Sequence, residues 1–147
     1  SGSGYLLSPT SIFMSSNRLY SQKNPTLKCS QASDKFTIDS SNGNGELDYP
    51  IGLITADEAS MAGGVYNIVN TRYYLYTGQN YWTLTPYRFT SSYAGAFAWY
   101  VTSSGLLARP RVTGGYGIRP VINLKADVQI TSGDGSAAHP FRVSLSS

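Results

Sequence analysis

The sequence has few of the residues from which metal centres and imidazole-dependent active sites are built. It contains one cysteine, Cys29, and one histidine, His139. An internal disulfide is therefore excluded, and neither a Cys₄ nor a Cys₂His₂ zinc site can be assembled. No flanking motif supports a Cys29–His139 dyad, so we expect neither residue to be catalytic. We predict no metal, no cofactor and no enzymatic activity.

Charged residues are also scarce, at 13% of the chain against a usual value of about 25%. The net charge is +3, but the eleven Lys and Arg residues are scattered along the chain. A nucleic-acid footprint needs a local cluster of basic residues, so we expect no binding to nucleic acid. No run of about 18 apolar residues exists, so we expect no insertion of this segment into a membrane.

The first four residues, Ser1-Gly2-Ser3-Gly4, have neither the charged start nor the apolar stretch of a signal peptide. We interpret residues 1–4 as a linker or a cloning remnant and residues 5–147 as a single domain, since globular domains usually have roughly 100–200 residues. We expect the chain to be a piece of a longer protein, in which Cys29 could find a partner.

Aromatic, small and hydroxyl-bearing residues are abundant, and they favour strands and turns. The chain holds twelve Tyr, fifteen Gly and seven Pro. The patterns predict strands or returning segments at residues 73–76, 81–84, 94–101, 106–112 and 118–124, and a terminal hairpin of residues 128–130 with 141–143. Together with a weak helix candidate at residues 9–20, this predicts an α+β fold with short helices and a mainly antiparallel sheet in the C-terminal half.

The clearest local signal lies in the middle of the chain. Residues 51–54 predict a short buried strand, and Thr55-Ala-Asp-Glu58 fits a capping box, in which Thr55 and Glu58 satisfy each other's free backbone amides. We therefore expect a helix over residues 56–62 that ends at Gly63.

Carboxylates offer two weaker alternatives. The loop from Asp39 to Asp48 carries oxygen ligands of the kind that Ca²⁺ takes, but its spacing matches no EF-hand, so whether it binds calcium stays open. A catalytic carboxylate pair could come from Asp57, Glu58, Asp127 and Asp134, but Asp57 and Glu58 have a capping role and Asp134 lies in a Gly-Asp-Gly turn.

Residues 81–119 combine Tyr, Trp and Arg with Ser and Gly, a composition typical of binding surfaces. Trp82, Phe97 and Trp99 are assigned mainly to packing. Arg109 and Arg111 alternate, so in a strand they would share one face. We predict that the outward side chains between residues 86 and 116 contact a ligand, and name Tyr87, Arg88, Tyr93, Tyr100, Arg109 and Arg111.

The order of several segments carries a resemblance to a known family. These segments are residues 49–58, 74–78, 81–86, 117–125 and 132–135 followed by Pro140. Over about residues 25–143 the chain resembles an uncharacterised bacterial domain family, common in cell-surface and pilin-like proteins of Firmicutes. That family is similar to the C-type-lectin-like fold of formylglycine-generating-enzyme-like domains and of the variable proteins of diversity-generating retroelements.

The resemblance implies that the Trp82 segment and the strand with Arg119 belong to a core sheet, and that the excursion between them displays the binding surface. The paired catalytic cysteines and the calcium-site tripeptides of related domains have no counterpart here, which argues against inherited catalysis or calcium-dependent sugar binding. It thus implies an adhesin-like or receptor-binding module of a bacterial cell surface or a phage particle, with a protein or glycan ligand on another cell or host surface.

Two other functions stay open. The first is a structural pilin-like or cell-surface subunit that assembles into a larger surface protein or filament. The second is a hydrolase or another enzyme that uses Cys29 or a pair of carboxylates.

Overall fold

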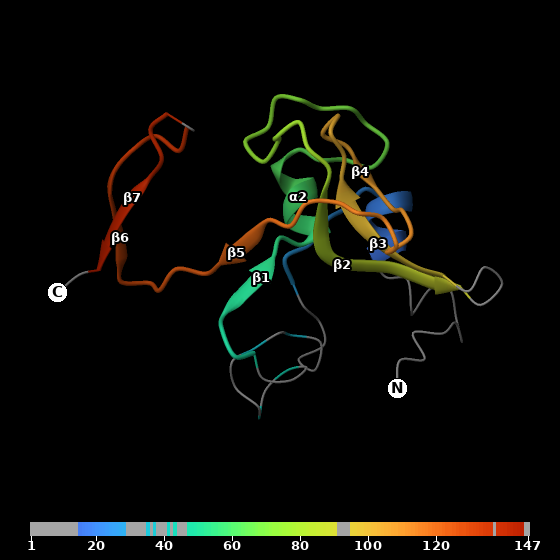
Figure 1. Ribbon diagram of the computed structural model, residues 1–147, viewed down its shortest axis with the longest axis horizontal. Helices are drawn as coiled ribbons and strands as arrows, with labels where there is room; N and C mark the ends of the chain where they lie inside the picture. Colours follow the sequence, from blue (N-terminus) through green and yellow to red (C-terminus); the bar gives the residue numbers. More distant parts are fainter. Residues whose placement is uncertain are drawn as a thin grey trace.

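A computed structural model describes residues 15–28, 35, 37, 41, 43, 47–90, 95–136 and 138–145. In this part of the chain the elements follow in the order η1 (Ser16–Ser21, a π-helix), β1 (Ile51–Leu53), α2 (Ala56–Ala62), β2 (Tyr81–Thr90), β3 (Gly95–Val101), β4 (Leu107–Ala108), β5 (Pro120–Ile122), β6 (Val128–Ser132) and β7 (Arg142–Leu145). All paired strands are antiparallel, in three small sheets ordered β1–β5, β2–β3–β4 and β6–β7 (Figure 1). The predicted α+β class, with few helices and mostly antiparallel pairing, is confirmed.

Helix α2 forms as the capping box predicts. The Oγ1 of Thr55 accepts a hydrogen bond from the backbone N–H of Glu58 at 3.1 Å, and Oε2 of Glu58 accepts one from the N–H of Thr55 at 2.8 Å. The helix ends at Gly63, whose φ of 127° lies in a region that side chains rarely allow. Strand β1 is also confirmed, but it is not buried, since Ile51 is 52% exposed.

The core lies between the β2–β3–β4 sheet and the two helices. Trp99 and Val101 of β3 are fully buried, and α2 contacts all three strands and η1. The buried apolar residues are Leu19, Ile54, Ala56, Ala59, Tyr73, Tyr81, Tyr87, Trp99, Val101 and Leu107. The turn that joins β3 to β4 is the predicted one, closed by hydrogen bonds between Thr102 and Leu106.

One ion pair attaches the N-terminal segment to this core. The Nε and Nη2 of Arg18 each donate to a carboxylate oxygen of Asp57 at 2.7 Å, and the N–H of Thr26 donates to Oδ1 at 2.9 Å. The hydrogen bonds to Asp57 raise the pKa of Arg18, against an opposing effect of burial. Because Asp57 is in the first turn of α2, the pair joins η1 and residues 22–26 to that helix.

Two predicted segments differ from the structure. Residues 73–76 are a turn, in which the N–H of Tyr76 donates to the carbonyl of Tyr73, and not a strand. The ring of Tyr73 packs against Gly63 and Gly64 at the end of α2. The helix candidate at residues 9–20 lies partly outside the described residues, and its described end belongs to η1.

The terminal hairpin forms as predicted, with Val128 opposite Leu145 and Ile130 opposite Val143. Figure 1 shows β6 and β7 standing apart from the rest of the molecule. Ile130, Phe141 and Val143 are exposed on it. Residues 1–4 lie outside the described residues, and the assignment of residues 5–147 to a single domain stays a prediction.

Substitution of the cap should destabilise the protein. We expect Thr55→Ala to lower the free energy of unfolding by about 1 kcal/mol, because a free amide of the first turn of α2 loses its acceptor. Thr71→Ala, at an exposed loop position, is the matched control. Urea denaturation followed by circular dichroism measures both variants, and an equal midpoint for Thr55→Ala and wild type would contradict the capping role.

Breaking the Arg18–Asp57 pair should cost more. Asp57→Asn leaves the half-buried guanidinium without its counter-charge, and we expect a loss of about 2–4 kcal/mol of unfolding free energy. Arg18→Met removes the cation instead and strands a carboxylate that is 5% exposed, so we expect a similar loss. Arg72→Met, at an exposed position, should leave the unfolding midpoint unchanged. Equal unfolding midpoints for Asp57→Asn and Arg72→Met would show that the ion pair does not stabilise the fold.

Candidate functional site

The three arginines that are predicted to contact a ligand lie around aromatic rings at the end of the β2–β3–β4 sheet. Arg88 lies directly opposite Phe97 in the β2–β3 register, and Arg111 forms an isolated antiparallel bridge with Phe97 from the other side. The guanidinium carbons of Arg88 and Arg111 are 5.3 and 6.0 Å from the centroid of the Phe97 ring. The pairing of β3 on both sides therefore brings two cations to one ring.

Arg109 adds a third cation beside them. Its guanidinium lies 4.8 Å from the ring centroids of Tyr20 and Tyr87 and 5.3 Å from that of Tyr66. Its Nη2 donates to the hydroxyl of Tyr66 at 3.1 Å. Arg109 is thus held by rings from three separate segments of the chain. We call the surface formed by Tyr20, Tyr66, Arg88, Phe97, Arg109 and Arg111 the arginine face.

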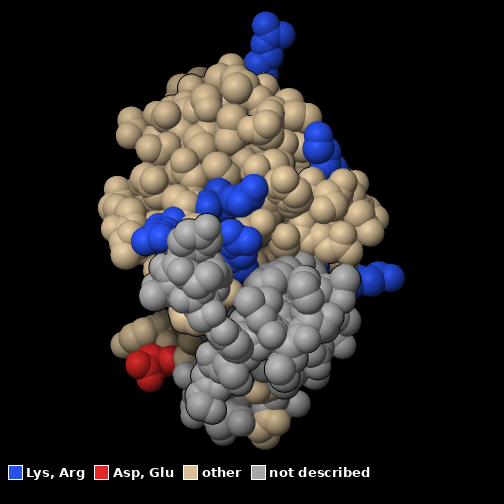
Figure 2. Space-filling model, turned by 90° about the vertical axis from the view of Figure 1, so that its right-hand side faces the viewer, with Lys and Arg blue, Asp and Glu red and all other residues tan. Residues whose placement is uncertain are grey.

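The arginine face is positively charged and incompletely satisfied. None of its three arginines pairs with a carboxylate among the described residues, where Arg18–Asp57 is the ion pair. The Nε atoms of Arg88 and Arg109 are buried and have no hydrogen-bond partner in the described part of the chain. Burying such donors without acceptors costs free energy, and cation–π contacts compensate for part of it. Figure 2 shows basic side chains gathered near the centre of the side of the molecule that is on the right in Figure 1.

Tyr87 does not point outward as predicted. Its side chain is 7% exposed and meets Trp99 edge to face at a centroid distance of 5.3 Å. The reason is a β-bulge: Pro86 pairs with Ala98 and Arg88 with Phe97, so Tyr87 is the extra residue between them. Bulges redirect side chains, and here the bulge turns Tyr87 into the core, where it supports Arg109. The prediction that Tyr87 points outward is therefore wrong.

Tyr100 is separated from the arginine face. Within β3 it alternates with Phe97 and Trp99, so its side chain lies on the opposite side of the sheet. There its ring stacks on Tyr116, with centroids 4.6 Å apart and planes at 11°, and Trp82 packs against both. Burial and, secondarily, the Tyr116 hydroxyl raise the pKa of Tyr100. Tyr100 therefore belongs to a second aromatic cluster, and Tyr93 lies outside the described residues.

The residues assigned to packing lie at structural positions. Trp99 is fully buried, and the N–H of Trp82 donates to the carbonyl of Gly117 at 3.0 Å. Arg119 donates from Nη1 to the carbonyl of Leu75 at 2.7 Å, and its guanidinium lies 4.8 Å from the centroid of Tyr81. In contrast to the arginine face, Arg119 has a backbone acceptor.

The remaining candidates from the sequence form no site in the described part of the chain. Cys29 and most of the loop between Asp39 and Asp48 lie outside it. Among the described residues, no three of His, Cys, Asp and Glu are grouped to hold a metal ion. His139 is in the turn between β6 and β7, where its carbonyl accepts from the N–H groups of Asp134 and Gly135. A hydrogen bond from Ser136 lowers the pKa of Asp134 in the same turn.

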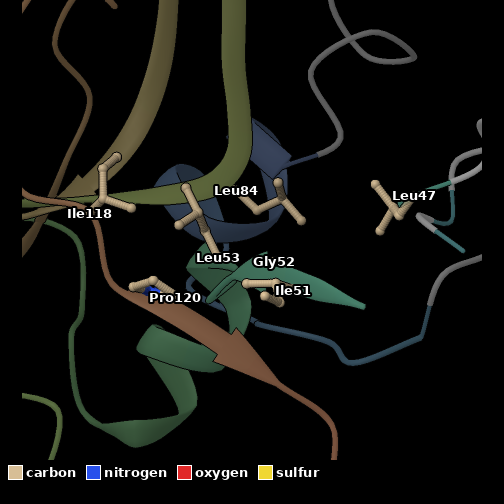
Figure 3. A pocket seen from close by; sticks show the side chains of 7 residues that line it. All are labelled: Leu47, Ile51, Gly52, Leu53, Leu84, Ile118 and Pro120. Carbon is tan, nitrogen blue, oxygen red and sulfur yellow. The ribbon is translucent and has the colours of Figure 1, made fainter. Parts of the chain in front are cut away.

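An apolar pocket lies beside the β1–β5 sheet, and no residue of the arginine face lines it. Its volume is about 300 Å³, and Figure 3 shows the side chains that line it. The lining residues are Leu47, Ile51, Gly52, Leu53, Leu84, Ile118 and Pro120. None of them carries a titratable or nucleophilic group, so the pocket itself provides no catalytic chemistry. No helix among the described residues has the length and apolar character needed to cross a bilayer.

Tyr20 and Tyr66 were not found by sequence reasoning. They lie far from Arg109 along the chain, and Tyr20 is in a segment that the sequence identifies only as a weak helix. The adjacent Arg18, which pairs with Asp57, brings Tyr20 into place. No local pattern in the sequence indicates that pairing.

Comparison with known proteins gives one assignment. No curated protein and no solved structure matches the chain. The model of a family described as "Domain of unknown function (DUF6273)" matches residues 1–126. The match ends just before β6, so the terminal hairpin lies beyond it. Because most of the chain is matched, the protein belongs to the DUF6273 family.

Proposed function

We propose that this domain is a non-catalytic recognition module and that it binds its ligand through the arginine face. The observation that carries the proposal is the set of three arginines, held on aromatic rings, that have no carboxylate partner among the described residues. If these side chains served stability alone, apolar residues would serve better, because the buried Nε atoms of Arg88 and Arg109 lack acceptors among the described residues. Cations kept unpaired at such a cost are suited to a ligand that supplies the acceptors.

The packing of the arginines favours binding. A free arginine loses rotamer entropy when it takes hold of a ligand, and this loss weakens binding. Arg109 is already fixed by three rings and by the hydroxyl of Tyr66, and Arg88 lies between Tyr87 and Phe97. Much of this entropy is lost on folding instead, so the face is preorganised.

We further propose a C-type-lectin-like arrangement for the domain. The backbone contact between Trp82 and Gly117 and the isolated parallel bridge between Tyr81 and Gly117 support it, because they join the two segments that the resemblance assigns to the core sheet. All three arginines of the face lie in the excursion between these segments. In this proposal the domain acts at a bacterial cell surface or on a phage particle, with a protein or glycan as its ligand.

One observation favours a second candidate, a structural subunit of a pilus or cell surface. The β6–β7 hairpin stands apart with Ile130, Phe141 and Val143 exposed (Figure 1). An isolated two-stranded hairpin is marginally stable in water, so packing on a neighbouring subunit or domain would stabilise it. The two candidates make different predictions, since removal of residues 127–147 should affect assembly and leave the arginine face intact.

The recognition function can be tested with the purified chain on glycan and protein arrays. We expect Arg88→Met, Arg109→Met and Arg111→Met to weaken binding to the array hits, with the strongest effect about 1–3 kcal/mol, as for binding hot spots. Arg72→Met and Arg142→Met remove exposed arginines elsewhere and are the controls.

Thermal unfolding establishes that each variant folds. Arrays without any hit, or hits bound with equal affinity by the wild type and all three folded variants of the face, would contradict the proposal.

A further inference from the structure

We infer that the ligand of the arginine face is an acidic glycan, bound through the carboxylate of a uronic or sialic acid residue. This inference rests on the proposed function and specifies its ligand. Two features of one surface support it. Guanidinium groups without a carboxylate partner among the described residues lie there beside partly exposed aromatic residues.

The charge of the face calls for an anion. Arg88, Arg109 and Arg111 lie around adjoining rings, and no described carboxylate neutralises them. Arg109 is held by the rings around it. Arg88 and Arg111 both lie over the ring of Phe97, and Arg111 is exposed. A guanidinium offers parallel N–H donors that match the two oxygens of a carboxylate. Arg88 and Arg111 are therefore the groups best placed to bind it, and Arg109 contributes a fixed positive charge.

The rings favour a sugar as the carrier of that carboxylate. Tyr20 is 41% exposed, and Phe97 is half-buried between two cations. Aromatic faces carry partial negative charge and attract the polarised C–H groups on the flat side of a sugar ring. A carboxylated sugar presents both features within one residue, so it can use a ring and a guanidinium together.

The pairing of β3 on both sides disfavours an extended peptide beside Phe97, although β2, which carries Arg88, is an outer strand of its sheet. Peptides commonly bind by adding a strand to a free sheet edge. Beside Phe97 no such edge is available, because β3 pairs with β2 on one side and with the segment of Arg111 on the other. The apolar pocket that could take a peptide side chain lies by β1 and β5 instead. An acidic peptide is therefore the alternative that the experiment must exclude.

The test compares acidic sugars with neutral counterparts and with an acidic peptide. Isothermal titration calorimetry with the purified chain uses tetragalacturonic acid and its methyl ester, sialyllactose and lactose, and an octaglutamate peptide. We expect one acidic sugar to bind at least tenfold more tightly than its neutral counterpart and more tightly than the peptide. Repeating the titration at higher salt should weaken binding of the acidic sugar and leave binding of its neutral counterpart unchanged.

Variants then locate the carboxylate. We expect Arg88→Gln and Arg111→Gln to reduce the preference for the acidic sugar at least tenfold, and Arg142→Gln to leave it unchanged. Tyr20→Leu keeps all three cations but removes one of the rings that hold Arg109, so it should weaken binding of the acidic sugar more than binding of the peptide. Thermal unfolding shows whether each variant is folded.

The outcomes separate this inference from the function on which it rests. Equal binding of acidic and neutral sugars, binding of the peptide in preference to both sugars, or no binding of either acidic sugar would overturn the acidic-glycan inference. The recognition function would still hold if an array ligand of any class required the three arginines. It would fail, and the inference with it, if no ligand depended on them.

Discussion

The buried ion pair between Arg18 and Asp57 is the interaction on which the remaining structure depends. Asp57 sits in the first turn of α2, where it is 5% exposed, and its two oxygens accept three hydrogen bonds. A carboxylate so deeply placed is tolerated because the donors replace its hydration and because the helix N-terminus is positive. The pair orders the segment that carries Tyr20, and Tyr20 in turn contacts Arg109. The Arg18–Asp57 ion pair thus helps to place Tyr20, one residue of the arginine face.

Five of the seven arginines of this chain fall into two groups with different physical consequences. Arg18 and Arg119 have their acceptors within the protein, a carboxylate for the first and a backbone carbonyl for the second. The three arginines of the arginine face have rings around them but few acceptors. Rings stabilise a guanidinium through its planar faces and leave its edges available. For this reason the second group, and not the first, is suited to contact with another molecule.

The parts of the fold that the sequence predicts are those decided by neighbours along the chain. Thr55 and Glu58 are three residues apart, and the helix that they begin stops at Gly63, so every determinant of α2 is local. The turn between β3 and β4 and the terminal hairpin are of the same kind. Residues 73–76 were mistaken for a strand because their aromatic composition suits strands and buried turns alike. Tertiary packing of Tyr73 on Gly63 and Gly64 decides between the two.

The site was harder to predict because its geometry depends on register. Alternation in β3 places Tyr100 on the opposite side of the sheet from Phe97, and this follows from the sequence once the strand is assigned. The bulge at Tyr87 could not be foreseen, since it arises from the pairing of Pro86 with Ala98. Proline lacks a backbone N–H and disrupts the regular ladder, which is consistent with a bulge beside it. Nor does any local pattern bring Tyr20 and Tyr66 to Arg109.

Strand alternation also explains how one segment can serve both stability and binding. Between Trp82 and Gly117 the chain contributes Trp99, Val101 and Leu107 to the core, all fully buried. The same segment presents Arg88 and Arg111 at its surface, while the backbone contact of Trp82 with Gly117 fixes its two ends. Arg111 is exposed and lies over Phe97, which is only partly buried, so its substitution can change the ligand preference while the buried framework stays intact. Tyr87 is the exception, because it packs on Trp99 and supports Arg109 at once, and it couples the stability of the core to the position of a binding residue.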